Sequence, residues 1–254
     1  MHRQNLIWFP SEATRGGTGR SPGISERYVA DSTLARRRYY GAGGDYLDYF
    51  SLSDGMIGID VGDLSGKGLP AAKYAALAVG TLRGIHKTGQ HPTQVMALLN
   101  KRLPLRKIPS GYTAIQYVQL DPITAQSHLS SAGMPGPMLL RAGECRVLKV
   151  AGISPGVFPE INDDHLTLEP GDSLLVYTDG LTDARDTQQA EFEAARLQQV
   201  CRSQAEKSPL LGHIFSTIQK FMGDRPQFDD ITPLAPRWAA FPRLQRFVPT
   251  CHLI

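Results

Sequence analysis

Hydrophobic residues follow a strand-like spacing in some segments of the chain and a helical spacing in others. Residues 46–52 and 56–62 are two strand-like runs, and Ser53-Asp54-Gly55 between them makes a good hairpin turn. Residues 112–120 alternate between two faces in the same way. Further strands are predicted at 126–131, 137–141, 145–150, 164–168 and 173–178, and a last short strand begins near Asp230.

The helical spacing begins at Pro70, a residue that suits the first position of a helix. Four apolar residues then recur at i, i+3, i+4 and i+7, namely Ala72, Ala75, Ala76 and Val79. Further helices are predicted at 92–103, 190–203 and 208–222. Because the strands are grouped apart from the helices, the order predicts an α+β domain with mostly antiparallel sheets.

Composition and charge narrow the class of protein. With 41% hydrophobic and 20% charged residues, the chain is neither fibrous nor wholly disordered. A formal net charge of +3 is too small to indicate nucleic acid or a membrane surface as a partner. No apolar run approaches the ~18 residues that span a bilayer. The N-terminus lacks the apolar core of a secretory signal, and the three cysteines have no framework spacing. A cytoplasmic location is therefore expected.

Changes in amino-acid composition along the chain predict that it has three parts. Residues 1–40 are rich in glycine, serine and arginine and are expected to be a lead-in. Residues 41–236 are expected to form the folded domain. Residues 237–254 contain three arginines and no acidic residue, and are expected to form a basic tail.

The candidate chemistry lies in aspartates that stand beside glycine at the ends of predicted strands. A carboxylate at the end of a buried strand lowers the stability of the folded state unless a cation or several hydrogen-bond donors contact it. A single hard divalent cation such as Mg²⁺ or Mn²⁺ can compensate the charge of several carboxylates, because these ions prefer oxygen ligands. The alternative is that each pair is only a turn, which is how we interpret Asp54-Gly55 and Gly171-Asp172. The four candidate segments are Gly43-Gly44-Asp45, Gly62-Asp63-Leu64-Ser65-Gly66-Lys67-Gly68, Tyr177-Thr178-Asp179-Gly180 and Asp229-Asp230-Ile231-Thr232.

Other reactive side chains lack a functional pattern. Neither Cys145 nor Cys201 has an arginine six positions later, so the signature of a cysteine-dependent phosphatase is absent. The histidines at positions 86, 91, 128 and 165 show no ligand spacing, and surface or loop roles are expected for them.

Taken together, GGDYLDYF, GDLSGKGLPAA, SAG, PGD, YTDGLTDA and DDIT resemble the metal-dependent protein phosphatases of the type-2C class. The closer resemblance is to the bacterial stage II sporulation protein E-like branch, and it covers residues 41–232. That branch includes phosphatases that activate stress sigma factors. The resemblance implies a four-layer α/β/β/α sandwich with two Mn²⁺ or Mg²⁺ ions at one edge of its two sheets.

The resemblance also implies a role for individual residues. Asp63 would bridge both metal ions, and the backbone carbonyl of Leu64 would complete the second site. Asp179 and Asp229 would hold the first ion. Asp45 would either orient metal-bound water or be a direct ligand, and these two alternatives stay open.

The expected roles of Asp230, Ser65 and Lys67 follow from their positions beside these residues. Adjacent strand residues point to opposite faces, so only one of Asp229 and Asp230 should reach the centre, and the resemblance favours Asp229. Ser65 and Lys67 lie near enough to meet a substrate phosphate. For Lys67, a solvated loop lysine is an equally good interpretation.

The function implied by the resemblance is hydrolysis of phosphoserine or phosphothreonine by metal-activated water. The substrate would be a phosphorylated protein such as an anti-sigma-factor antagonist. One alternative is a non-catalytic interaction module on the same fold, because Met134 replaces a frequent histidine and Pro233 and Pro236 interrupt the last strand. Another is a phosphatase of small metabolites. The choice between Mn²⁺ and Mg²⁺ and the oligomeric state stay open.

Overall fold

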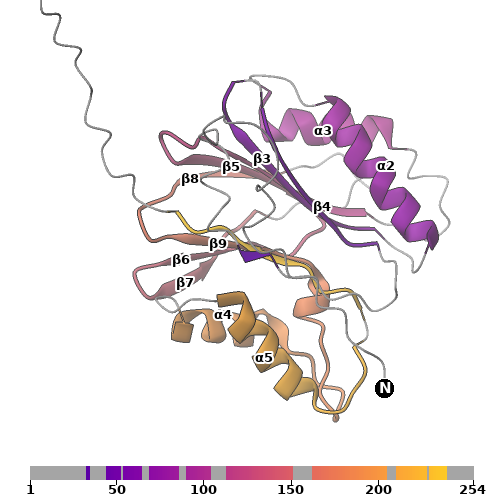
Figure 1. Ribbon diagram of the computed structural model, residues 1–254, viewed down its shortest axis with the longest axis vertical. Coiled ribbons are helices and arrows are strands. Elements are labelled where there is room, and N and C mark those ends of the chain that lie inside the picture. The colour runs from indigo at the N-terminus through magenta and orange to yellow at the C-terminus, as the bar shows by residue number, and fades with distance from the viewer. Residues whose placement is uncertain are drawn as a thin grey trace, which may run out of the picture.

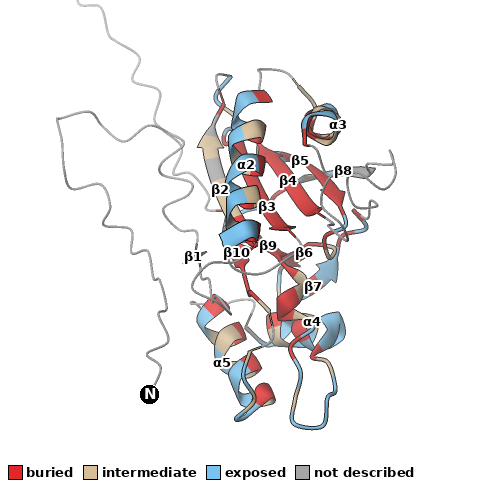
Figure 2. Cartoon of the chain, turned by 90° about the vertical axis from the view of Figure 1, so that its right-hand side faces the viewer, coloured by how far each residue is buried: buried red, intermediate tan, exposed pale blue. Residues whose placement is uncertain are grey.

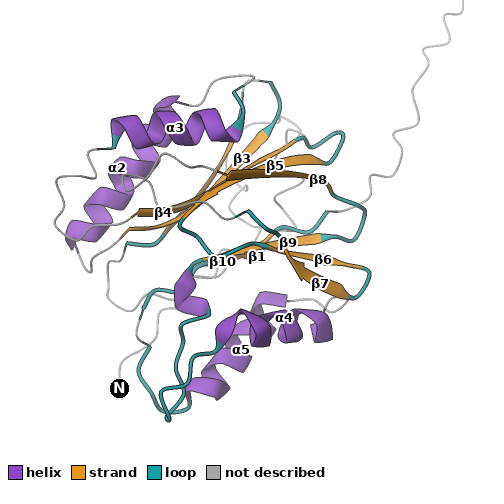
Figure 3. Ribbon diagram, turned by 180° about the vertical axis from the view of Figure 1, so that it is seen from behind, coloured by secondary structure: helices purple, strands orange, loops and turns teal. Residues whose placement is uncertain are grey.

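Two five-stranded antiparallel sheets pack face to face, and a pair of helices covers the outer face of each sheet (Figure 1). The computed structural model describes residues 33–34, 44–52, 54–64, 69–85, 90–103, 113–150, 162–204, 210–227 and 229–238. Seen from behind in Figure 3, α2 and α3 lie on one side of the two sheets and α4 and α5 on the other. The predicted α+β fold, a four-layer sandwich, is confirmed.

The first sheet has the order β2-β3-β4-β5-β8. Its strands are β2 (Tyr46–Ser51), β3 (Ile57–Leu64), β4 (Thr113–Leu120), β5 (Gln126–Ala132) and β8 (Asn162–Thr167). The helices on its outer face are α2 (Leu69–Ile85) and α3 (Pro92–Arg102). Within the described ranges, no helix has both the length and the apolar character needed to cross a membrane.

The second sheet has the order β1-β10-β9-β6-β7. Its strands are β1 (Thr33–Leu34), β10 (Pro233–Ala235), β9 (Ser173–Tyr177), β6 (Met138–Arg141) and β7 (Glu144–Val147). The helices α4 (Glu193–Gln204) and α5 (Leu210–Met222) cover it, and a short 3₁₀ helix, η2 (Asp179–Leu181), follows β9.

The core between the sheets is built from alternate residues of each strand. Along β3, Ile57, Ile59 and Val61 are buried against the second sheet, and along β9, Leu174 and Val176 are buried against the first. The intervening residues of both strands face the helices, as the period of two along a strand requires. Each such burial contributes about 1.5–3 kcal/mol. Figure 2 shows this pattern as buried strands between helices with exposed outer faces.

The last strand begins later than the sequence predicted. The prediction placed its start near Asp230, but β10 runs only from Pro233 to Ala235. Proline has no N–H to donate to a strand ladder, so it is tolerated as the first residue of a strand. The strand is short, as predicted, and Asp229 and Asp230 therefore lie in the loop before it.

Both outer parts of the chain contribute residues to the sandwich. β1, from the segment 1–40, pairs with β10, and Trp238, from the segment 237–254, is 8% exposed and packs between the sheets. The boundaries at 40/41 and 236/237 stay predictions.

Candidate metal centre

Asp45 and Asp63 lie side by side at one end of the first sheet. The row of β3 side chains that faces the second sheet continues from Val61 to Asp63. Asp45 directly precedes β2, whose first residue, Tyr46, pairs with Gly62. Asp45 is 3% exposed and Asp63 is 7% exposed. Two buried carboxylates thus terminate neighbouring strands on the face between the sheets.

The second sheet supplies the facing residues. On β9, the alternation that buries Val176 against the first sheet continues to Thr178, which is fully buried. Asp179 comes next and begins η2. Asp229 lies in the loop between α5 and β10, and Thr232 directly precedes β10. β9 and β10 are antiparallel neighbours, so the end of β9 and the start of β10 lie together.

Two threonine hydroxyls join Asp45 to the second sheet. Thr178 Oγ1 donates to Asp45 Oδ2 at 2.8 Å, and Thr232 Oγ1 donates to the same oxygen at 2.7 Å. Thr178 Oγ1 also accepts a hydrogen bond from the backbone N–H of Thr232 at 3.1 Å. Because these groups are buried, the hydrogen bonds to the charged oxygen are stronger than they would be in water.

Burial, together with the charges of neighbouring carboxylates, raises the pKa of Asp63 to about 8. Burial is the largest cause, and the negative charges of Asp45, Asp179 and Asp229 add to it, as does a hydrogen bond with Asp45. Among the described residues, no cation opposes this shift. The structure therefore brings together the four aspartates that the sequence singled out, although they come from distant segments.

Asp183 is a further acidic residue of this region that the sequence analysis missed. Burial raises the pKa of Asp179 to about 6, with additional contributions from the charges of Asp183 and Asp229. The backbone N–H of Asp183 donates to the carbonyl of Asp179 at 2.8 Å, so the two residues are one turn apart. Their spacing of four residues in YTDGLTDA was the available signal.

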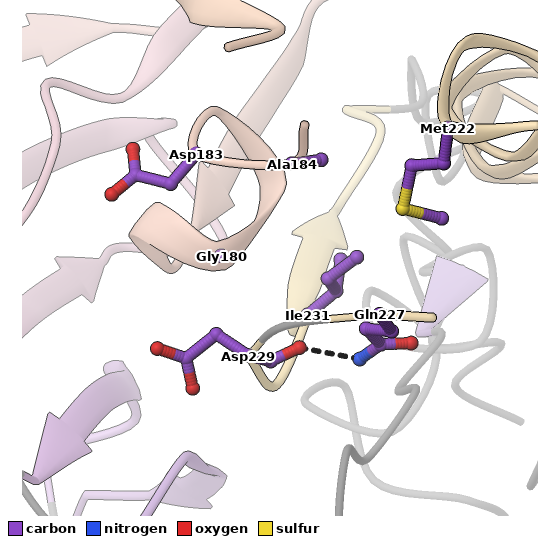
Figure 4. Close-up of a pocket in the computed structure, with 7 residues that line it drawn as sticks. All are labelled: Gly180, Asp183, Ala184, Met222, Gln227, Asp229 and Ile231. Carbon is purple, nitrogen blue, oxygen red and sulfur yellow. Dashed lines mark hydrogen bonds between the residues drawn. The ribbon is translucent and has the colours of Figure 1, made fainter. Parts of the chain in front are cut away.

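Asp183 and Asp229 share a small pocket beside the centre (Figure 4). In Figure 4 their carboxylates project to the same side of the pocket, away from Met222. The residues that line the pocket are Gly180, Asp183, Ala184, Met222, Gln227, Asp229 and Ile231.

Two glycines permit the close backbone contacts that hold the centre together. A Cβ atom on Gly44 would overlap the carbonyl oxygen of Leu64, and one on Gly180 would overlap the carbonyl oxygen of Asp230. The Leu64 side chain is buried on the helix side of the sheet. Gly44 thus brings the Leu64 carbonyl, a predicted metal ligand, against the residue that precedes Asp45.

Of the two adjacent aspartates before β10, Asp229 is the one whose charge acts on Asp63 and on Asp179. The backbone N–H of Asp230 donates to Asp229 Oδ1 at 2.8 Å, and Gln227 Nε2 donates to the Asp229 carbonyl at 2.5 Å. These bonds hold the loop in place. The assignment of individual metal ligands stays a prediction.

The donor set fits a hard divalent cation. Carboxylate and carbonyl oxygens are the ligands that Mg²⁺ and Mn²⁺ prefer, and the region offers both kinds. In the described ranges, no group of three or more His, Cys, Asp or Glu residues already has the arrangement of a metal site. Without a cation, like charges repel and Asp63 retains its proton at neutral pH. Cation binding at this centre would therefore have to displace the proton of Asp63.

The remaining sequence candidates lie elsewhere or outside the described residues. Ser65 and Lys67 fall outside the described ranges, as does His86. Met134 is 6% exposed and packs in the core between the sheets. Three histidines without sequence pattern do gather near the start of α3: the ring centroids of His91 and His128 are 5.1 Å apart and those of His128 and His165 are 6.4 Å apart.

Known proteins share this combination of sequence and fold. The family described as Stage II sporulation protein E (SpoIIE) matches residues 53–239. Protein IcfG of Synechocystis sp. is 25% identical over 231 residues, which cover 76% of this chain and 35% of that protein. Phosphoserine phosphatase RsbU of Bacillus subtilis is 27% identical over 205 residues, which cover 76% of this chain and 59% of that protein. The chain thus spans less than two thirds of either relative.

Solved structures share the architecture. The SiaA-PP2C domain of Pseudomonas aeruginosa superposes with a TM-score of 0.72 at 22% sequence identity. The match covers 84% of this chain and 90% of that domain. At this identity, the likeness shows a common fold.

We expect Gly44→Ala and Gly180→Ala each to destabilise the protein, because the added methyl group must displace a backbone carbonyl. The expected loss in the free energy of unfolding is about 1–3 kcal/mol, measured by urea denaturation. Gly80→Ala in α2 is a matched control, since nothing lies within 4 Å of its added Cβ. It should stabilise the protein by about 0.5–1 kcal/mol. A Gly44→Ala protein as stable as wild type would contradict the close contact with Leu64.

The metal-free protein should lose stability as the pH rises from about 4 to about 8. Asp63 in the unfolded chain ionises near its ordinary value of 3.8, whereas in the folded protein it keeps its proton up to about pH 8. The folded state therefore binds more protons in this window, and the free energy of unfolding falls with rising pH. Melting temperatures in EDTA between pH 5 and pH 8 should decline less for Asp63→Asn than for wild type. Parallel declines would show that Asp63 is not the buried, protonated group described above.

Proposed function

The chain belongs to the stage II sporulation protein E family, and on that premise we propose that it is a metal-dependent protein serine/threonine phosphatase. The observation that carries the proposal is the convergence of Asp45, Asp179 and Asp229 on Asp63 at one end of the sandwich. A packing role alone does not explain four carboxylates at one place, because burying them together is unfavourable.

We propose that Asp63, Asp179, Asp229 and the carbonyl of Leu64 hold two Mn²⁺ or Mg²⁺ ions, with Asp63 shared between them. Bound ions of this kind acidify water and neutralise negative charge on phosphate oxygens. Among the described residues, the charged groups that act on Asp63 are all carboxylates, and these would repel a phosphate dianion. Phosphate binding is therefore expected to depend on the cations.

The protein residues have definite tasks in this scheme. Asp63 would give up its proton when cations bind, and both of its oxygens would then be available as ligands. Asp45 and Asp63 are buried, and the effective dielectric constant around them is therefore lower than that of water. Each charge consequently acts more strongly on its neighbours than it would in water. Gly44 and Gly180 allow the backbone to approach closely enough to keep the acidic residues in one place.

The substrate we propose is phosphoserine or phosphothreonine on a protein, such as an anti-sigma-factor antagonist, in bacterial signalling. The support is the relation to RsbU, which is named a phosphoserine phosphatase. A cytoplasmic location forms part of this proposal.

Two departures from the family pattern suggested a non-catalytic module, and both have packing roles. Met134 fills the core between the sheets, and Pro233 occupies the first position of β10, where its missing N–H is tolerated. Neither residue is among the groups that act on Asp63. The phosphatase proposal therefore stands ahead of the non-catalytic alternative.

Purified protein should hydrolyse para-nitrophenyl phosphate in the presence of Mn²⁺ and lose this activity in EDTA. Asp63→Asn and Asp179→Asn should each lower kcat/KM by more than about 100-fold, since even groups that only support a metal ligand commonly cost 10–100-fold. Asp224→Asn is the control, because Asp224 is exposed beyond the end of α5. Its activity should equal that of wild type.

Two results would contradict the proposal. One is folded, Mn²⁺-saturated wild type that hydrolyses neither this ester nor phosphoserine peptides, which would favour the non-catalytic module. The other is an Asp63→Asn protein with the wild-type rate, which would remove Asp63 from the centre.

A further inference from the structure

We propose that Thr178 and Thr232 are positioning residues, which turn Asp45 so that only its Oδ1 oxygen can serve the cation centre. The inference rests on the proposed function, because it assigns the part that Asp45 plays in that centre. It also restricts both roles that the sequence left open to a single oxygen, since an Asp45 whose Oδ2 is held by two hydroxyls cannot be a bidentate ligand.

The first step of the argument concerns the oxygen that both threonines contact. Thr178 and Thr232 donate to the same atom, Asp45 Oδ2, at 2.8 and 2.7 Å. A carboxylate oxygen has two lone pairs in the plane of the carboxylate, and two hydroxyl donors use both of them. Oδ2 therefore has no remaining lone pair with which to bind a cation.

The second step concerns the direction of the hydroxyl protons. Thr178 Oγ1 accepts the backbone N–H of Thr232, so its own proton is directed to Asp45. The result is a one-way chain from Thr232 N–H through Thr178 Oγ1–H to Asp45 Oδ2, in which each bond polarises the next. Oδ2 of Asp45 therefore only accepts in this chain, and both threonine hydroxyls act on it as donors.

The third step concerns the direction in which Oδ1 faces. Asp45 is also hydrogen-bonded to Asp63, the residue at the middle of the acidic group. With Oδ2 turned to the threonines of the second sheet, Oδ1 is the oxygen left for Asp63 and its surroundings. Asp45 can then act on the cation centre through one oxygen, either as a monodentate ligand or as a hydrogen-bond acceptor.

The same bonds set the spacing between the two halves of the centre. Asp45 and Asp63 belong to the first sheet, whereas Asp179 follows Thr178 and Asp229 lies three residues before Thr232. Bonds from Thr178 and Thr232 to Asp45 therefore link the two halves of the acidic group directly. Without these hydroxyls, the side chain of Asp45 should adopt more than one orientation. The distance between Asp45 and Asp63 on one side and Asp179 and Asp229 on the other should also become less well defined.

The test compares variants that remove a hydroxyl with variants that keep it. Thr178→Val, Thr232→Val and their double variant keep the shape of the side chain but cannot donate. Thr178→Ser and Thr232→Ser keep the donor. Thr113→Val is the matched control, because Thr113 is equally buried and its Oγ1 has no hydrogen-bond partner.

The readouts are the Mn²⁺ dissociation constant from isothermal titration calorimetry, kcat at saturating Mn²⁺, and the melting temperature in EDTA. We expect the valine variants to bind Mn²⁺ about 10–100-fold more weakly, as for other groups that orient metal ligands. The serine variants and Thr113→Val should stay close to wild type in Mn²⁺ affinity. A purely structural role would instead lower the melting temperature and leave the Mn²⁺ affinity unchanged.

Valine variants with wild-type Mn²⁺ affinity would overturn the inference, even if they melt at a lower temperature. Should the double variant fail to fold, the single variants decide, because each removes one of the two donors. The outcome is separable from the proposed function. Wild type that binds Mn²⁺ without hydrolysing phosphate esters contradicts the phosphatase proposal alone, whereas active wild type with unaffected valine variants contradicts the positioning role alone.

Discussion

The alternation of side chains along antiparallel strands determines both the core of this protein and the position of its acidic centre. The rows that bury Ile59 and Val61 on one sheet and Val176 on the other continue, without a change of face, to Asp63 and Thr178. The space between the sheets is therefore apolar along most of its length and polar at one end. The hydrogen bonds from Thr178 and Thr232 to Asp45 close that end and join the two sheets.

Electrostatics explains why such a centre needs a cation. Burial makes the ionisation of Asp63 less favourable, and the charges of the neighbouring carboxylates add to the effect. Part of this unfavourable energy is relieved in the metal-free protein by the proton on Asp63. Divalent cations would relieve it more completely, and they would reverse the sign of the local field so that a phosphate is attracted. The acidic group is thus unfavourable for folding alone and suitable for binding cations.

The sequence was sufficient for the fold and for the acidic residues, and insufficient for the contacts between them. Periodicity and turn residues identified the strands and helices because these signals are local. Thr178 and Thr232 escaped notice because their partner, Asp45, is 133 and 187 residues away in the chain. The late start of β10 followed from Pro233, whose effect on pairing depends on its position in the sheet. The proximity of Asp183 to Asp179 was missed because it depends on the turn that follows β9, which the sequence pattern did not predict.

The most direct test of the central claim is X-ray diffraction from crystals grown with Mn²⁺, recorded at the manganese absorption edge. The account predicts two anomalous peaks at the end of the sandwich, both within ligand distance of Asp63, with Asp179 and Asp229 on the side of the second sheet. The absence of peaks there at saturating Mn²⁺, or peaks that lie only on other surfaces, would contradict it.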